Sequence, residues 1–270
     1  MDPGASRLFG RSQPLEREDP RSDPGRLDRG TRVSTFFARL RTAAGADWQA
    51  YVGHAFVDGL ARGTLPEAAF RHYLVQDYLF LIHFARAYAL AVVKADDLAG
   101  MRSAAATLDA LINHEMKLHI EFCRDWGITP EEMEQAPEAA ECMAYTRYVL
   151  DRGLSGDILD LKVALAPCVV GYREIAAAIR DRHDFKTIGN PYLPWIEMYS
   201  GADYGAVADD AVAELDRLAA TRATEARFPA LARTFAEACR LEAGFWEMGW
   251  RAGQDGRKAG LWGRLTGRGR

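Results

Sequence analysis

Apolar residues in the central part of the chain recur every three or four positions. This spacing holds between residues 33 and 252, and Gly and Pro residues separate the periodic segments. The region has no run with the two-residue alternation of a β-strand next to a hairpin turn signal. The pattern therefore predicts an all-α protein in which a single domain is built as a bundle of about eight helices.

Capping residues and helix breakers divide this region into segments. Thr129, Pro130 and Glu132 form a helix start, and Pro167 should kink a long helix because it lacks the N–H that a helix interior needs. No repeat of fixed period relates the segments, which disfavours a solenoid. The expected helices are 35–60, with a break at Gly45 or Gly53, then 66–94, 97–126, a short helix from 130, 137–152, 157–183, 191–200, 203–222 and 226–251.

The two ends of the chain differ in composition from the centre. Residues 1–32 contain 4 Gly, 4 Pro and 7 Arg, and residues 251–270 contain 6 Gly and 6 Arg or Lys. Neither end has periodic apolar positions, and such segments bury too little apolar surface to fold. We expect a disordered N-terminal extension at 1–32, a helical domain at 33–252 and a flexible basic tail at 253–270.

The net charge of the chain is −4, but its helical region is more acidic. Because the C-terminal end is basic, residues 33–250 carry a net charge of −10. An acidic body argues against a nucleic-acid partner. No stretch of 18 apolar residues lacks charges, and no apolar segment lies near the start. We therefore expect no membrane span, no secretory signal and a cytoplasmic protein.

Ionisable or reactive side chains interrupt the apolar faces of four predicted helices. A lone buried carboxylate is costly unless it is hydrogen-bonded, and a structural role with a neighbouring Tyr or His explains one such residue. Four helices that each direct a polar group inward predict a polar pocket between them. The interrupting residues are Asp77, Glu115 with His119, Cys168 and Glu242.

The residue types in this pocket suit nucleophilic chemistry on a flat ring. Cys168 is the candidate nucleophile, and Asp77 and Glu242 can divide the acid and base roles. By pattern alone, such a cysteine is more often a small buried apolar residue than a catalytic nucleophile. The aromatic side chains that can sandwich a ring are Phe80, Tyr145, Tyr172, Tyr199 and Phe245.

A metal site is the alternative interpretation of these polar residues. Glu115 and His119 lie four positions apart, which does not match the Glu-x-x-His pairs of helical di-iron sites and is more typical of a structural hydrogen-bonded pair. The four cysteines form no Cys-x-x-Cys pair, which argues against a structural zinc site. The conceivable ligands are His72, His83, His114, His119, Asp77, Glu115 and Glu242.

Six segments, taken together in their order and spacing, carry a resemblance to a known family. They are GTLPEAAFRHYLVQDYLFLIHFA (63–85), HEMKLHIEF (114–122), AYTRYVL (144–150), ALAPCVVGYREI (164–175), NPYLPWIEMYSG (190–201) and EAGFWEMGW (242–250). Over about residues 35–253 the chain resembles the TenA family, also called thiaminase II or aminopyrimidine aminohydrolase. The resemblance implies the all-α fold of the haem-oxygenase-like type.

The resemblance also implies roles for individual positions. Cys168 is similar to the active-site cysteine of the family, Asp77 to the aspartate that holds the aminopyrimidine, and Glu242 to the glutamate that donates and accepts protons. Glu115 and His119 resemble a structural pair. The positions similar to pocket aromatics are Tyr145, Tyr172, Tyr199, Phe245 and Phe80, the last of which is often Tyr in the family.

The reaction that the resemblance implies is a step of thiamine salvage. It converts 4-amino-5-aminomethyl-2-methylpyrimidine and water to the 5-hydroxymethyl form and ammonia, without a cofactor or metal, in a homotetramer. The expected partner is thus a small pyrimidine, with no nucleic acid and no membrane involved. Two alternatives share the scaffold: a non-catalytic pyrimidine-binding or regulatory member of the same fold, and a metal-dependent oxidase relative.

Overall fold

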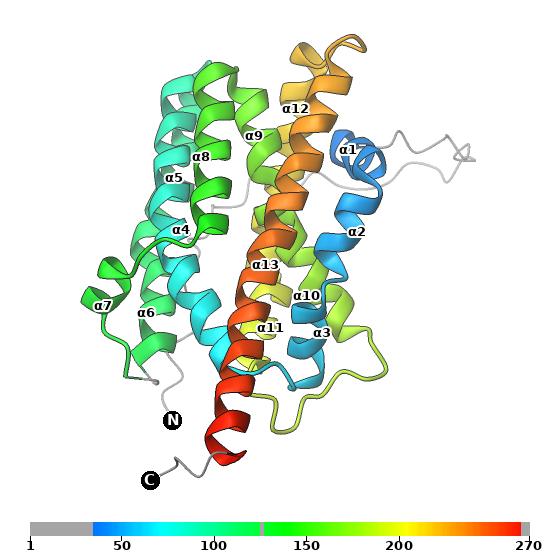
Figure 1. Ribbon diagram of the computed structural model, residues 1–270. Coiled ribbons are helices and arrows are strands. Elements are labelled where there is room, and N and C mark those ends of the chain that lie inside the picture. Colours follow the sequence, from blue (N-terminus) through cyan, green and yellow to red (C-terminus); the bar gives the residue numbers. More distant parts are fainter. Residues whose placement is uncertain (1–34, 125–126, 266–270) are drawn as a thin grey trace, which may run out of the picture. The chain divides into compact units, whose positions relative to one another are not determined.

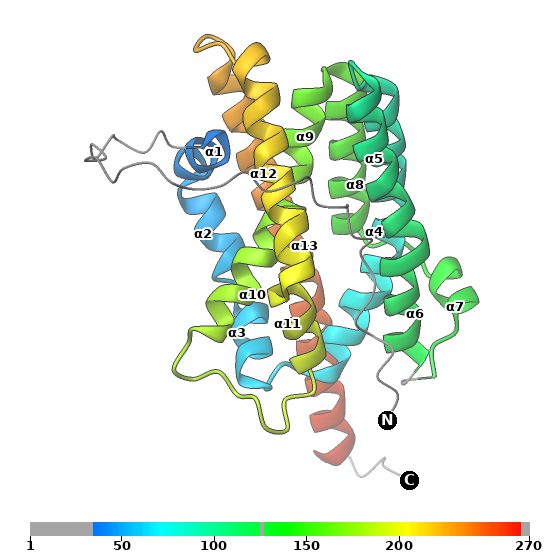
Figure 2. The ribbon, with the colours of Figure 1, turned by 180° about the vertical axis from the view of Figure 1, so that it is seen from behind.

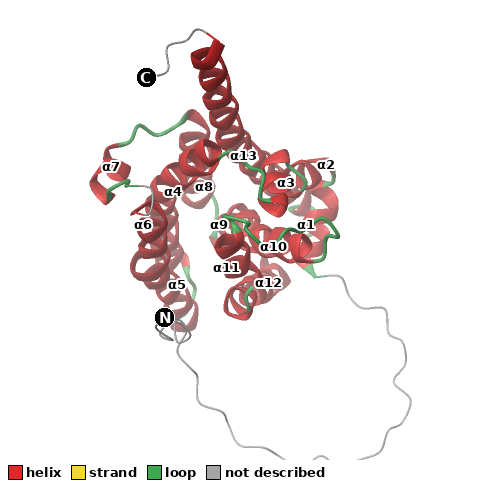
Figure 3. Ribbon diagram, turned by 90° about the horizontal axis from the view of Figure 1, so that it is seen from below, coloured by secondary structure: helices red, strands yellow, loops and turns green. Residues whose placement is uncertain are grey.

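The computed structural model describes residues 35–124 and 127–265 (Figure 1). The disordered extension predicted for residues 1–32 lies outside the described residues, as do residues 266–270 of the predicted tail. The described part of the chain contains helices and loops and no strand, as Figure 3 shows. The prediction of an all-α fold is therefore confirmed.

The described residues form thirteen α-helices and two π-helical turns. Each π-helical turn joins two α-helices without a break. The described residues therefore form eleven continuous helices, compared with the predicted number of about eight. In chain order they are α1 (Phe36–Ala44), α2 (Ala46–Val52), α3 (Ala55–Arg62), α4 (Glu67–Lys94), α5 (Leu98–Ala110), η1 (Leu111–Glu115), α6 (Met116–Arg124), α7 (Pro130–Gln135), α8 (Ala140–Ser155), α9 (Ile158–Ala166), η2 (Pro167–Gly171), α10 (Tyr172–Arg180), α11 (Leu193–Ser200), α12 (Ala202–Arg222) and α13 (Phe228–Leu265).

Helices α4 and α13 form the centre of the bundle. They pack on each other more extensively than any other pair, and α13 also packs on α1, α2, α8 and α9 (Figure 1). In α4, 15 of the 28 residues are buried, as expected for a helix covered on several sides. The reverse view shows α10, α11 and α12 on the other face (Figure 2). A polar residue on the inward face of α4 or α13 is therefore placed in the core.

Local signals explain several helix boundaries. The first predicted segment breaks at both candidate glycines, and Gly45 has a φ of 46°, which favours glycine because it has no Cβ. Thr129 and Glu132 form the expected capping box at the start of α7. Asp157 caps α9 in the same way and also bonds Arg227, which ties α9 to the loop before α13. Local sequence chemistry thus determines where these elements start.

The expected end of the last helix near Arg251 is wrong, because α13 continues to Leu265. No proline interrupts this stretch, and glycine inside a helix costs only about 1 kcal/mol. Gly253 is buried, and a Cβ there would lie 2.7 Å from Ala69 and 3.1 Å from Pro66. The glycine that seemed to start a tail instead allows α13 to approach the start of α4 closely.

The irregularity expected at Pro167 appears as the π-helical turn η2. Such turns leave backbone carbonyls without their usual helical partners. Two tyrosine hydroxyls donate to carbonyls here: Tyr51 to the Pro167 oxygen at 3.2 Å and Tyr204 to the Val169 oxygen at 3.1 Å. Gly171 provides the room, since a Cβ at this position would lie 2.4 Å from the Tyr51 ring. Packing from two other helices therefore holds η2 in place.

Gly171→Ala is expected to lower the free energy of unfolding by about 1–3 kcal/mol, because its methyl group would overlap the buried Tyr51 ring. Urea or thermal unfolding measures this change. Gly244→Ala in α13 is the matched control, since a Cβ there meets no heavy atom within 4 Å. That control should gain about 0.5–1 kcal/mol. Equal stability of Gly171→Ala and the unchanged protein would contradict the packing at η2.

Candidate active site

The structure brings the predicted site residues into one region of the core. Their contacts form a connected network across α4, α8, η2, α10, α11 and α13. We call the ionisable and hydroxyl-bearing part of this network the polar cluster. It consists of Asp77, Glu115, His119, Tyr145, Cys168, Tyr172, Tyr199 and Glu242.

Asp77 lies at the middle of α4 and is only 6% exposed. One of its oxygens, Oδ2, lies 2.6 Å from Nε2 of His119 and accepts a bond from the Tyr73 hydroxyl at 3.2 Å. The other imidazole nitrogen lies 3.0 Å from the Glu115 backbone carbonyl. Since both ring nitrogens face oxygen acceptors, the imidazole carries both protons when Asp77 is ionised. Among the described residues, no hydrogen bond reaches Oδ1 of Asp77, which stays available to a ligand.

The pKa of His119 reflects this arrangement. Burial lowers it, but the hydrogen bond and charge of Asp77 and the charge of Glu115 outweigh burial, so the pKa lies above its ordinary value. A protonated His119 pairs with an ionised Asp77 and offsets the cost of burying either charge alone. The contact therefore keeps an anionic acceptor inside the core.

Glu115 and His119 form the expected hydrogen-bonded pair, but the acceptor is the backbone carbonyl of Glu115 and not its carboxyl. His119 is bonded to the backbone carbonyl of Glu115 and to the carboxyl of Asp77. The Glu115 carboxyl accepts instead from the Tyr199 hydroxyl, at 3.4 Å. Glu115 lies in the π-helical turn η1, whose wider turn changes the direction of side chains relative to a regular α-helix. The spacing of four residues therefore predicted the contact with His119 but not the partner of the Glu115 carboxyl.

The carboxyl of Glu242, on α13, has Tyr145 and Cys168 as neighbours. The Tyr145 hydroxyl donates to Oε1 of Glu242 at 2.9 Å, and the Cys168 thiol lies close enough to this carboxyl for each group to shift the pKa of the other. Burial raises the pKa of Glu242 to about 8, the charge of Asp77 adds to the shift, and the bonds from Tyr145 and Cys168 partly oppose it. A carboxyl that titrates near neutral pH is suited to exchange protons with a bound group.

Cys168 is the only residue of η2 that keeps some exposed surface, since the other four are buried. Burial raises the pKa of its thiol well above the ordinary value, and the charges of Glu242 and Asp77 raise it further. The resting cysteine is therefore a neutral thiol. Its proton must move to a base before it can react, and Glu242 is the base in contact with it.

Aromatic rings surround the polar cluster in two groups. Phe80 lies between Tyr145 and Phe245, with ring centroids 5.0 and 5.7 Å away. In the second group, the Tyr172 and Tyr199 centroids lie 4.9 Å apart. Such rings favour a flat, partly apolar ligand.

Three residues of this network were absent from the predicted site. Tyr73 donates to Asp77, Trp195 Nε1 donates to the Tyr73 hydroxyl at 3.3 Å, and Trp246 packs 5.2 Å from the Tyr73 ring. Tyr73 precedes Asp77 by four positions, one helical turn, and this spacing was the available signal. Trp195 and Trp246 looked like ordinary core residues, since only the fold places them beside Tyr73.

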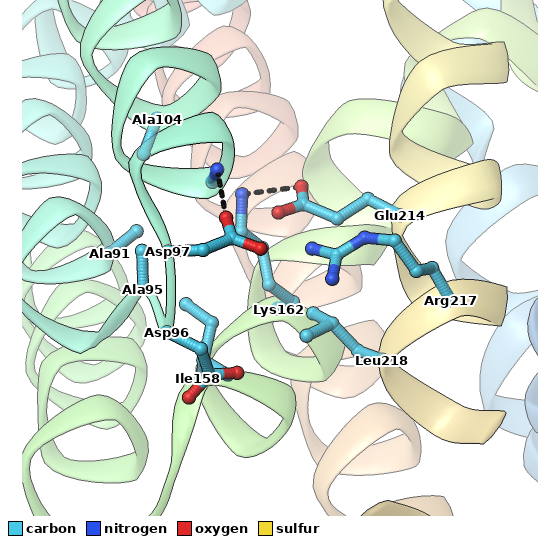
Figure 4. Close-up of a pocket in the computed structure, with 11 residues that line it drawn as sticks. Ala91, Ala95, Asp96, Asp97, Ala104, Ile158, Lys162, Glu214, Arg217 and Leu218 are labelled. Carbon is cyan, nitrogen blue, oxygen red and sulfur yellow. Dashed lines mark hydrogen bonds and ion pairs between the residues drawn. The ribbon is translucent and has the colours of Figure 1, made fainter. Parts of the chain in front are cut away.

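A recess lies elsewhere, between α4, α5, α9 and α12, and Figure 4 shows the side chains that line it. Its volume is about 280 Å³ including the open mouth. Several charged groups here already have structural partners: Lys162 bonds Glu214 at 2.7 Å, and Asp97 caps α5 by accepting from the Gly100 N–H. The recess is therefore a weaker candidate for chemistry than the polar cluster.

Two further findings concern other classes of protein. Within residues 35–124 and 127–265, no three His, Cys, Asp or Glu side chains are grouped so that they could hold a metal ion. Over the same described ranges, no helix has the length and apolar character needed to cross a membrane.

Comparison with known proteins identifies the family. The fold and cluster define an all-α protein with a thiol–carboxyl pair in its core, and the chain belongs to the TENA/THI-4/PQQC family, whose model matches residues 42–252. An uncharacterised protein of Haemophilus influenzae is 41% identical over 202 residues, which are 75% of this chain and 93% of that protein. The aminopyrimidine aminohydrolase of Halalkalibacterium halodurans is 34% identical over 219 residues, 79% of this chain and 95% of that one.

Solved structures agree with this assignment. A TenA family transcription regulator from a Silicibacter species is 46% identical, with a TM-score of 0.74 over 79% of this chain and 96% of that one. A domain of unknown function with a heme oxygenase-like fold from Shewanella denitrificans is 15% identical, with a TM-score of 0.61 over 83% of this chain and 95% of that one. The expected haem-oxygenase-like fold is therefore confirmed.

Burial of Glu242 is expected to make stability fall as pH rises. Its folded-state pKa of about 8 exceeds the ordinary value of 4.5, so between these pH values the folded protein keeps a proton that the unfolded chain loses. Glu242→Gln removes this titration. The free energy of unfolding of the variant, relative to the unchanged protein, should therefore increase by more than about 1 kcal/mol from pH 5 to pH 8.

Urea unfolding at several pH values measures this difference. Glu197→Gln is the control, because Glu197 is an exposed glutamate on α11. It should follow the pH dependence of the unchanged protein. A difference between Glu242→Gln and the unchanged protein that stays constant from pH 5 to pH 8 would contradict a neutral, buried Glu242.

Proposed function

We propose that this protein is a hydrolase, an aminopyrimidine aminohydrolase (thiaminase II) of thiamine salvage. Its substrate would be 4-amino-5-aminomethyl-2-methylpyrimidine, and its products the 5-hydroxymethyl pyrimidine and ammonia. The observation that carries this proposal is the Cys168 thiol beside Glu242, a carboxyl with a raised pKa, in the same cluster as Asp77. The aminohydrolase name and 34% identity of the Halalkalibacterium halodurans relative support it.

Asp77 supplies recognition of the ring. Its Oδ2 is committed to His119 and Tyr73, and Oδ1 can accept from the amino group and protonated ring nitrogen of an aminopyrimidine. The rings of Phe80, Tyr145 and Phe245 provide apolar surface for the flat substrate. The absence of a hydroxyl on Phe80, where Tyr is frequent in the family, leaves stacking intact and removes one polar contact.

The reaction begins with transfer of the Cys168 thiol proton to Glu242. The ionised form of Glu242 takes the thiol proton, and the thiolate sulfur forms a bond to the ring carbon next to a ring nitrogen. The carbon–nitrogen bond of the substituent breaks with its electron pair on nitrogen, and Glu242 passes the thiol proton to the departing nitrogen. Water then adds to the remaining carbon and gives a proton to Glu242, the sulfur–carbon bond breaks, and this proton returns to the sulfur, which restores the thiol and the ionised carboxyl.

A pyrimidine-binding regulator on the same fold would need Asp77 and the aromatic rings. It would have no use for a cysteine in contact with a base, and a carboxyl held at a pKa of about 8 would only lower its stability above pH 4.5. The Cys168–Glu242 pair thus favours the enzyme.

Cys168→Ser is expected to reduce ammonia release from 4-amino-5-aminomethyl-2-methylpyrimidine by about three orders of magnitude, because a hydroxyl is a far weaker nucleophile at this pH. A coupled ammonia assay measures the rate. Cys123→Ala is the matched control: Cys123 is a fully buried free cysteine on α6, and its loss should leave the rate within about threefold of the unchanged protein.

The outcome separates the two functions. Ammonia release that survives Cys168→Ser would remove this cysteine as the nucleophile. Tight pyrimidine binding without ammonia release by the unchanged, folded protein would favour the regulator.

We further propose a homotetramer in the cytoplasm, where the four free cysteines stay reduced. Contacts between copies would cover apolar side chains that one chain leaves exposed: Val93, Leu98, Met101, Ile112, Met143 and Leu154. Light scattering should give four times the chain mass of 29.9 kDa, and a monomer mass at micromolar concentration would contradict the tetramer.

A further inference from the structure

A second carboxyl lies in the polar cluster and has no part in the reaction proposed above. Glu115 ends the turn η1, and its Oε1 accepts from the Tyr199 hydroxyl at 3.4 Å. Tyr199 is 2% exposed and packs between Tyr172 and Tyr204, with ring centroids 4.9 and 4.8 Å away. The Glu115 carboxyl is thereby held against one of the aromatic groups that surround the cluster.

The charge of Glu115 reaches the nucleophile. The pKa of Cys168 is raised first by burial, then by the charges of Glu242 and Asp77, and next by that of Glu115. The pKa of Tyr204 is raised by burial and then by Glu115. Contacts also link the two groups: Tyr199, which bonds Glu115, packs on Tyr204, and the Tyr204 hydroxyl donates to the backbone carbonyl next to Cys168 in η2.

No cationic side chain is dedicated to Glu115. Burial raises its pKa to about 7, the positive charge of His119 lowers it, the charge of Asp77 raises it, and the bond from Tyr199 lowers it. His119 is already bonded to Asp77 at 2.6 Å. In the described part of the chain, no Lys or Arg forms an ion pair with Glu115. A carboxylate at this position therefore has unused capacity for a cationic ligand.

We propose that the Glu115 carboxylate binds the ammonium group of the 5-aminomethyl substituent and thereby determines the preference for an amine leaving group. This inference rests on the proposed function. With the amidine edge of the ring on Asp77 and the thiol of Cys168 on a ring carbon, the substituent next to that carbon lies near the thiol. Glu115 is the carboxyl near the thiol that neither of these contacts uses.

Binding the substituent as an ammonium also suits the bond cleavage. When the carbon–nitrogen bond of an ammonium breaks, its electron pair stays on nitrogen and neutral ammonia departs. The electrons that the carbon needs come from the ring adduct of Cys168, so no additional acid or oxidant is required. A carboxylate that stabilises the positive charge raises the fraction of substrate in this form.

The test compares two ligands that differ only in this group. In the Cys168→Ser protein, calorimetry measures the affinities for 4-amino-5-aminomethyl-2-methylpyrimidine and for its neutral 5-hydroxymethyl product. Adding Glu115→Gln, which keeps the size and the acceptor for Tyr199, should weaken binding of the amine by about tenfold or more. Binding of the alcohol should change by less than about threefold. Equal weakening of both ligands would show a merely structural role and overturn the proposal.

In the Cys168→Ser protein that keeps Glu115, the preference for the amine over the alcohol should depend on pH. The pKa of about 7 means that the carboxylate population grows between pH 6 and pH 8, so the preference for the amine over the alcohol should grow as well. Glu242 also titrates in this range, and the Glu115→Gln protein, whose remaining pH dependence comes from Glu242, isolates the contribution of Glu115 by difference. A preference in the Cys168→Ser protein that does not change with pH would also overturn the proposal.

Two variants complete the design. Tyr199→Phe removes the hydrogen bond to Glu115 but keeps its charge, so a loss of preference smaller than that of Glu115→Gln is expected. Glu197→Gln, at an exposed position of α11, should change neither affinity. If neither ligand binds and the unchanged protein releases no ammonia, the proposed function itself fails. If both bind and Glu115→Gln leaves the preference intact, only this inference fails.

Discussion

The contact between His119 and Asp77 in the core sets the electrostatics of the site. A carboxylate at the centre of α4 would be too costly to bury alone, and the protonated imidazole 2.6 Å away offsets that cost. The charge of Asp77 then raises the pKa values of Glu242, Glu115 and Cys168. One buried anion thus favours the protonated forms of its neighbours, so the thiol rests neutral and the two glutamates titrate near neutral pH.

Both π-helical turns in the described part of the chain contribute a residue to the polar cluster. Cys168 lies in η2, and Glu115 lies in η1. A π-helical turn widens the helix by one residue, so it changes which side chains face inward without ending the helix. At η2 the hydroxyls of Tyr51 and Tyr204 satisfy carbonyls of the turn, and Gly171 leaves room for the Tyr51 ring. The packing of neighbouring helices therefore stabilises the positions that carry the reactive groups.

Much of the fold could be predicted because its signals are local. The capping box at Thr129, the break at Gly45 and the apolar period of α4 each depend on a few residues close in sequence. The end of α13 could not be predicted in this way, because Gly253 is an ordinary helix-ending residue until Ala69 and Pro66 pack against it. For the site, polar residues within apolar stripes indicated which helices contribute to the polar cluster. They did not indicate every partner, since the Glu115–His119 spacing gave no sign that the Glu115 carboxyl accepts from Tyr199.

By itself, the amino-acid sequence determined the all-α class and the inward direction of Asp77, Cys168 and Glu242, because helical periodicity alone decides which face is apolar. The tertiary structure decided which groups touch: Tyr73 and His119 on Asp77, Tyr145 and Cys168 on Glu242, and Tyr199 on Glu115. It also decided the charge states of these groups. Burial and neighbouring charges shift a pKa only once helices distant in sequence enclose the group, and no local pattern contains that information.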